Sequence, residues 1–110
     1  MTARSKALLV TSGSATGGYI AVGGPDASHV WLVKFIAYHR NDTTPGDDIV
    51  AMRVWDAAHI EAPLVYVNES VHPDGVELLN VPLTLDPNMS LLLYSPHAWE
   101  LYVGGAELTA

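Results

Sequence analysis

The chain has 110 residues, which suits one domain with one hydrophobic core, and 49% of them are apolar, which excludes a disordered chain. Twelve acidic residues against five basic ones give a net charge of −7, so the body should repel phosphate and we expect no nucleic-acid partner. The chain has no cysteine and no apolar run near the ~18 residues that span a bilayer, so we expect no disulfide, no thiolate site and no membrane partner.

The first residues are basic, unlike the rest of the chain. Arg4 and Lys6 supply two of the five bases. Residues 7–11 predict a first short strand, and this apolar run is too short for the core of a signal peptide, so we expect no secretion. Residues 1–6 are then either a frayed terminus or an N-terminal arm that docks on an acidic neighbour.

The longest β-like run covers residues 28–40, with the sequence SHVWLVKFIAYHR. Strict alternation would give it two apolar faces. A strand of this kind is expected at the centre of a sheet with both faces covered, and another subunit could supply one cover. Alternation places Trp31, Val33, Phe35 and Ala37 on one face, and Val30, Leu32, Ile36 and Tyr38 on the other, which only Lys34 interrupts.

Turn residues divide the rest of the chain into short strands. About eight strands without a substantial helix predict an all-β fold, an antiparallel β-sandwich of jelly-roll-like type in which residues 1–110 form a single domain. The further strands are expected at 19–22, 49–55, 63–69, 76–85, 89–94 and 99–103, with Pro82 marking an edge or a bulge. A flexible link at 12–18, a polar hairpin loop at 41–48, and turns at 23–26, 56–59, 71–75 and 86–88 separate the strands.

The last two strands are expected to form a closing hairpin with different faces. In the first, Met89, Leu91 and Leu93 share one side and Ser90, Leu92 and Tyr94 the other. In the second, Trp99, Leu101 and Val103 face one way while Glu100 and Tyr102 face the other. The final strand therefore predicts one core face and one wet or contact face.

No arrangement of side chains predicts catalysis. The five histidines, His29, His39, His59, His72 and His97, show no pair at i, i+2 or i, i+4, so surface histidines are favoured over a distributed metal site. Asp47 and Asp48 are adjacent in a loop, which suits solubility or capping better than a carboxylate pair for glycoside hydrolysis. We therefore expect no enzyme, no cofactor and no metal.

The aromatic residues leave one binding alternative open. They suit a core and interface set, but they could also build a platform on which sugars stack. The set comprises Trp31, Trp55, Trp99, Tyr19, Tyr38, Tyr66, Tyr94 and Tyr102.

Two segments carry a resemblance to a known class of protein. The ending VPLTLDPNMSLLLYSPHAWELYVGGAEL is similar to the ending of small structural proteins of tailed-bacteriophage virions, where an LxPGD turn leads to an LYxxxS strand and a VxVSGAEL close. LDPN at 85–88, LLY at 92–94 and LYVGGAEL at 101–108 stand in these places. The run YIAVGGPDASHVWLVKFIAYHRND resembles their YxVPAGKxxxVKxIxxxN segment. The chain departs from the pattern at Asn88, at Gly105 and at the first turn, which lacks Pro-Ala-Gly.

The resemblance implies a capsid decoration (cement) protein that binds and stabilises the lattice of the major capsid protein. Such a protein is made in the host cytoplasm and located on the capsid exterior. The mean hydropathy of +0.20 favours an oligomer, expected as a homotrimer. A tail- or connector-associated virion protein, a carbohydrate-binding β-sandwich module and a small cupin-like enzyme are the alternatives. The expected protein contacts are Arg4, Lys6, Asp42, Asp47, Asp48, Glu100 and Tyr102.

Overall fold

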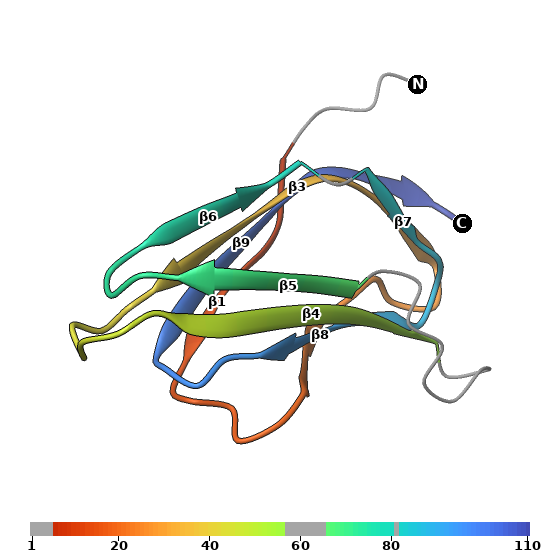
Figure 1. Cartoon of the computed structure of the whole chain (residues 1–110). Coiled ribbons are helices and arrows are strands. Elements are labelled where there is room, and N and C mark those ends of the chain that lie inside the picture. Colours follow the sequence, from red (N-terminus) through yellow and green to blue (C-terminus); the bar gives the residue numbers. More distant parts are fainter. Residues whose placement is uncertain (1–5, 57–65, 81) are drawn as a thin grey trace.

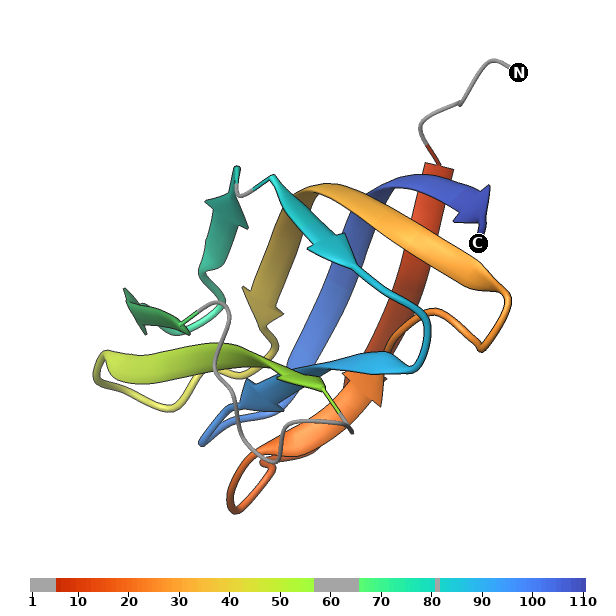
Figure 2. The same ribbon diagram turned by 90° about the vertical axis from the view of Figure 1, so that its right-hand side faces the viewer.

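The computed structural model describes residues 6–56, 66–80 and 82–110, which fold into two antiparallel sheets packed face to face (Figures 1 and 2). The predicted all-β antiparallel sandwich is confirmed, with nine strands in the described ranges. In those ranges we find no helix that could cross a membrane. The strands are β1 (Lys6–Gly13), β2 (Ile20–Gly23), β3 (His29–Arg40), β4 (Asp48–Asp56), β5 (Tyr66–Val71), β6 (Val76–Leu79), β7 (Leu83–Leu85), β8 (Met89–Tyr94) and β9 (Trp99–Thr109).

Sheet A has the strand order β1-β9-β3-β6, with β7 also pairing with β3, and sheet B has the order β2-β8-β4-β5. Alternating residues of both sheets fill the space between them, as the period of a strand requires. Trp99 closes one end of this core, where its indole Nε1 donates to the carbonyl oxygen of Ser14 at 3.0 Å. The core residues are Trp31, Val33, Ile36, Tyr38, Val50, Met52, Val54, Val71, Leu85, Met89, Leu91, Leu93, Trp99, Leu101 and Val103.

A β-bulge in the middle of β3 makes the predicted alternation of residues 28–40 wrong. Pairing with β9 shifts between Val33 and Phe35, so Lys34 is an extra residue in the ladder. Beyond the bulge, Ile36 and Tyr38 join Val33 in the core. Phe35 and Ala37 lie on the other face and are only partly buried. The positions of β3 that face the core therefore change from odd-numbered to even-numbered residues at the bulge.

The glycine pair of β9 fits this bulge. A Cβ atom on Gly105 would lie 2.1 Å from the carbonyl oxygen of Leu32, and one on Gly104 would lie 2.4 Å from the ring of Phe35. Side chains at these positions would separate β3 from β9. The Gly-Gly of the sequence is thus explained by the close approach of two central strands.

The connections between strands also differ from the prediction. Strands β8 and β9 pair in different sheets, so they form no closing hairpin, and the loop at 41–48 likewise carries the chain from sheet A to sheet B. The expected strand 76–85 is divided into β6 and β7, both on β3, which agrees with an edge or a bulge near Pro82. The expected turn at 56–59 and the start of strand 63–69 fall mostly outside the described residues.

Candidate functional site

One end of the molecule is organised by a buried arginine. The side chain of Arg40 is fully buried, and its Nε donates to Asp42 Oδ1 at 2.8 Å. Its two terminal nitrogens donate to the carbonyl oxygens of Thr44 (2.7 Å), Gly46 (2.6 Å) and Val71 (3.1 Å). The polar loop at 41–48 therefore surrounds the guanidinium of Arg40. Its charge is paired with Asp42, and its terminal N–H groups donate to backbone carbonyl oxygens.

His97 closes the same loop from the outside. Its Nδ1 lies 2.5 Å from Asp42 Oδ2 and its Nε2 lies 2.5 Å from Asp48 Oδ2. The two ring nitrogens of His97 thus face two carboxylates, one near each end of the loop. Partial burial acts to raise the pKa of Asp42, but hydrogen bonds from Arg40 and His97 outweigh it and lower that pKa below its usual value.

Two further histidines extend this group. His39 Nε2 lies 2.6 Å from Asp74 Oδ1, and its Nδ1 lies 3.2 Å from Glu100 Oε1. The hydrogen bond to Asp74, helped by the one to Glu100, raises the pKa of His39. His72 pairs with Asp47 at 2.6 Å.

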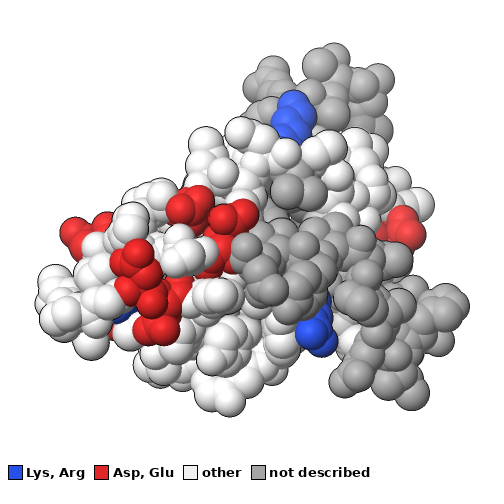
Figure 3. All heavy atoms as spheres, in the orientation of Figure 1, with Lys and Arg blue, Asp and Glu red and all other residues white. Residues whose placement is uncertain are grey.

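These residues form the acid–histidine end of the molecule, where the loops at 41–48, 72–75 and 95–98 meet. Figure 3 shows carboxylates gathered at this end. The histidines and arginine hold several of them in fixed positions, so the surface offers ordered negative charge to a partner. The acid–histidine end comprises His39, Asp42, Asp47, Asp48, His72, Asp74, His97 and Glu100.

A second surface is the outer face of sheet A, which turns away from the core. Seven large hydrophobic side chains of the described residues are exposed, and all but Ile20 and Ile49 lie on this face. Such a concentration of exposed apolar side chains on one face is typical of a contact surface. The five are Val10, Leu32, Val76, Leu78 and Tyr102.

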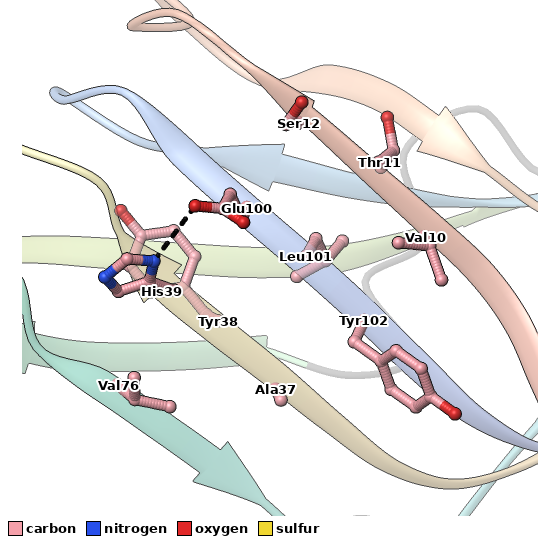
Figure 4. A pocket seen from close by; sticks show the side chains of 10 residues that line it. All are labelled: Val10, Thr11, Ser12, Ala37, Tyr38, His39, Val76, Glu100, Leu101 and Tyr102. Carbon is pink, nitrogen blue, oxygen red and sulfur yellow. Dashed lines mark hydrogen bonds and ion pairs between the residues drawn. The ribbon is translucent and has the colours of Figure 1, made fainter.

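The outer face has a ridge and a hollow. The rings of Phe35 and Tyr102 stack, with centroids 5.5 Å apart and planes inclined by 16°, and they form the ridge. Beside it lies an open hollow of about 390 Å³, over Ala37 and bordered by Val10 and Val76 (Figure 4). The face is therefore shaped to take a protruding group.

The structure divides the predicted contact residues among three places. Asp42, Asp47, Asp48 and Glu100 lie at the acid–histidine end, where histidines pair with them. Tyr102 lies on the outer face of sheet A, opposite in direction to the buried Trp99, so the prediction for the two faces of the last strand is confirmed. The other two predicted residues, Arg4 and Lys6, are N-terminal.

Lys6 does not reach the acid–histidine end. Arg4 lies outside the described residues. Lys6 belongs to β1 rather than to an arm, at the far end of sheet A, and its Nζ lies 3.3 Å from Glu107 Oε1. The expected N-terminal arm at 1–6 therefore does not include Lys6, which belongs to strand β1.

Sequence reasoning missed Arg40 and the histidines that hold the carboxylates of the acid–histidine end. Arg40 is one of only three bases after residue 6 and stands directly before the polar loop, which is a signal that it serves that loop. The pairing of His97 with Asp42 and Asp48 leaves no local signal, because these residues lie far apart in the sequence. Within the described ranges, no three histidine or carboxylate side chains are grouped as metal ligands would be.

No protein-family model, curated protein or solved structure matches the chain.

Proposed function

We propose that this chain is a structural protein of a tailed-bacteriophage virion, specifically a capsid decoration protein that binds and stabilises the lattice of the major capsid protein. The observation that carries the proposal is the concentration of exposed apolar side chains on the outer face of sheet A. A protein whose work is assembly needs such a face on a rigid body, to be covered by further copies of the chain or by the shell.

The place of the resembling segments supports the same function. LYVGGAEL at 101–108 belongs to β9, and the upstream run contains β3, and these two strands pair at the centre of sheet A. These two strands of the resembling segments thus build the centre of the sheet that carries the apolar face, whereas LLY at 92–94 and residues 20–23 lie in sheet B. Two strands that resemble phage virion proteins in sequence, β3 and β9, are therefore among the strands that present the exposed apolar side chains.

The acid–histidine end supplies the proposed contact with the lattice. Its carboxylates are held by Arg40 and by histidines, so they lose little freedom on binding. Ordered negative charge suits a lattice surface that presents lysine or arginine. The contact would be made by the loop at 41–48 together with the turn at 72–75.

The proposal is tested with purified protein and undecorated capsids of the phage that encodes it. We expect the protein to co-sediment with the capsids and to raise their melting temperature. Asp47→Asn should weaken binding roughly two- to fivefold, because an exposed ion pair contributes modestly. Asp26→Asn is the matched control, since Asp26 also pairs with a histidine but lies at the opposite end of β3. Absence of co-sedimentation, or equal weakening by both variants, would contradict the proposal.

A tail or connector location remains the nearest alternative within the virion. Copy number separates the two locations, because a capsid coat needs hundreds of copies and a neck or tail needs a handful. Quantitative mass spectrometry of intact particles gives this number directly. A handful of copies would move the protein from the shell to the tail.

The hollow beside Tyr102 favours one candidate function of another class, carbohydrate binding. An aromatic ring next to Glu100, His39, Ser12 and Thr11 offers a stacking surface with polar groups at its margin. A glycan array and a sugar titration followed by tyrosine fluorescence test it. Binding that Tyr102→Ala removes would support this function in place of the capsid one.

A further inference from the structure

The outer face of sheet A pairs unlike side chains across its two central strands. Tyr102 of β9 stands opposite Ala37 of β3, so a large side chain faces a small one. One row along, Glu100 of β9 stands opposite His39 of β3, so an acid faces a base. In the first row the larger side chain is on β9 and the smaller one on β3. In the second row the acid is on β9 and the base on β3.

The same contrast extends to the flanking strands. Val10 of β1 stands beside Tyr102, and Leu78 of β6 stands beside Ala37, in one row across the sheet. Both aliphatic side chains project, with exposed fractions of 69% and 57%. The row thus runs from an exposed Val10, past the ridge and the hollow, to an exposed Leu78.

A twofold axis parallel to β9 and β3, and passing between two stacked faces, would match these features. It would lay β9 of one copy over β3 of the other, and β1 over β6. Tyr102 would then meet the hollow over Ala37 of the second copy. Glu100, which keeps its hydrogen bond to His39 of its own chain, would face the same acid–base pair of the second copy. Val10 would meet Leu78 of the second copy, so that apolar groups meet at both margins.

We propose that the outer face of sheet A is a self-complementary interface that joins two copies of this chain about such an axis. The interface is isologous, because each contact is made twice by the same pair of residues. The two stacked faces are expected about 10 Å apart with strands within about 30° of each other, as in aligned sheet packing.

The distribution of charge favours association of two copies through the outer face of sheet A rather than through another face. Two bodies of net charge −7 repel, so they associate best where acids are few and balanced. Glu100 on the outer face is already paired with His39, and the other predicted acidic contacts, Asp42, Asp47 and Asp48, stand in the loop at the end of the molecule. Face-to-face packing leaves that loop free for another partner.

The area agrees with a dimer. Four strands at a spacing of ~4.8 Å and four outward rows at ~6.7 Å give about 500 Å² for each copy. The pair would bury roughly 1,000 Å², which is near the lower limit of specific interfaces. We therefore expect a dimer that dissociates on dilution rather than an obligate one.

The first test is the mass of the full chain by light scattering and analytical ultracentrifugation over a range of concentrations. We expect two chains per particle at high concentration. Leu78→Asp should weaken the dimer at least tenfold, whereas Ile49→Asp, equally exposed at 55% but on sheet B, should leave it unchanged. Circular dichroism and thermal melts of both variants verify that the fold is kept.

The second test fixes the arrangement by crosslinking through introduced cysteines, which the chain permits because it has no cysteine of its own. In the double variant Val10→Cys and Leu78→Cys, the two positions lie three strand spacings apart, ~14 Å, too far for a short crosslink within one chain. A short bismaleimide should give a covalent dimer, because facing positions of two copies project from backbones about 10 Å apart, a gap too wide for a direct disulfide. The control, Val10→Cys with Ile49→Cys, should not give a covalent dimer.

Three results would overturn the proposal. One is a single-chain mass at all concentrations, and another is a dimer that Leu78→Asp and Ile49→Asp affect equally. The third is a mass of three chains, which would favour the homotrimer of the resemblance. Because no capsid enters these tests, their failure is distinct from failure of the proposed function, on which the interface does not depend.

Discussion

Arg40 is the residue whose removal should most damage the acid–histidine end. In Arg40→Met, the carbonyl oxygens of Thr44, Gly46 and Val71 lose their donor, and Asp42 loses the guanidinium that pairs with its Oδ1. Loss of one partner of a buried ion pair costs about 3–5 kcal/mol in the free energy of unfolding. Urea denaturation measures this loss, and Lys6→Met is the control.

Lys6 makes an ion pair too, but its side chain is 54% exposed. We expect Lys6→Met to cost less than ~1 kcal/mol, because solvent and salt screen such a pair. Similar losses in the two variants would show that burial of Arg40 does not matter to the loop.

His39 should make stability depend on pH. Its hydrogen bonds with Asp74 and Glu100 raise its pKa in the folded state above the ordinary 6.5, so the folded protein binds the proton more tightly than the unfolded chain. The stabilisation is therefore complete below pH 6.5 and is lost as the pH rises through the folded pKa. Urea unfolding at pH 6 and pH 8 should show a larger loss for the natural chain than for His39→Gln.

The control for this pH dependence is direct titration. NMR of the ring protons should show His39 titrating above 6.5 in the natural chain and returning toward 6.5 in Asp74→Asn. The pKa of His29 is raised too, by its hydrogen bond to Asp26, so His29→Gln shows how much of the pH dependence arises at the other end of β3. An unchanged pH dependence in His39→Gln would contradict the assignment.

At the scale of elements, the fit of β9 into the bulge of β3 is the most demanding contact. Gly105→Ala places a Cβ 2.1 Å from a backbone oxygen of Leu32, whereas Gly104→Ala places one 2.4 Å from a side-chain ring that can shift. We expect losses of about 2–4 kcal/mol for Gly105→Ala and about 1–2 kcal/mol for Gly104→Ala in thermal or urea unfolding. Gly18→Ala meets nothing within 4 Å and should change stability by less than ~0.5 kcal/mol.

The elements also show how far sequence can predict this fold. Alternation and turn residues locate the strands because both act over neighbouring residues. Met89, Leu91 and Leu93 are correctly predicted to share one face of a strand, and the structure shows that this face is the buried one. The bulge at Lys34 is not visible in alternation, because the apolar residues on both sides of it suit either face. The choice of partner strand depends on long-range pairing, which explains why β8 and β9 were expected as a hairpin and yet lie in different sheets.

The same limit applies to the candidate site. The sequence predicts polar loops and their acids, and it places Glu100 and Tyr102 on the outward side of the last strand. It does not show that His97 holds Asp42 and Asp48, since that contact joins a turn between sheets to a loop about fifty residues earlier. Side chains that meet only after the two sheets have packed are beyond local pattern.

At the scale of the whole molecule, the acids of the loop at 41–48 and the apolar area occupy different surfaces, with only His39 and Glu100 belonging to both, and salt should separate the roles of the two surfaces. Ion pairing with a lattice weakens as the Debye length falls from about 10 Å at 0.1 M to about 3 Å at 1 M salt. Packing of apolar faces does not weaken in this way. Raising NaCl from 0.05 to 0.5 M should therefore lower capsid binding at least tenfold while the dimer of the free protein stays as stable or becomes more stable.

Co-sedimentation and analytical ultracentrifugation at matched salt concentrations measure the two equilibria separately. Asp47→Asn should reduce the salt dependence of capsid binding without changing that of the dimer, and Leu78→Asp should weaken the dimer at every salt concentration. If salt dissociates the dimer and leaves capsid binding intact, the two surfaces have been assigned in the wrong order. The outer face of sheet A would then be the lattice contact, and the acid–histidine end would join the copies.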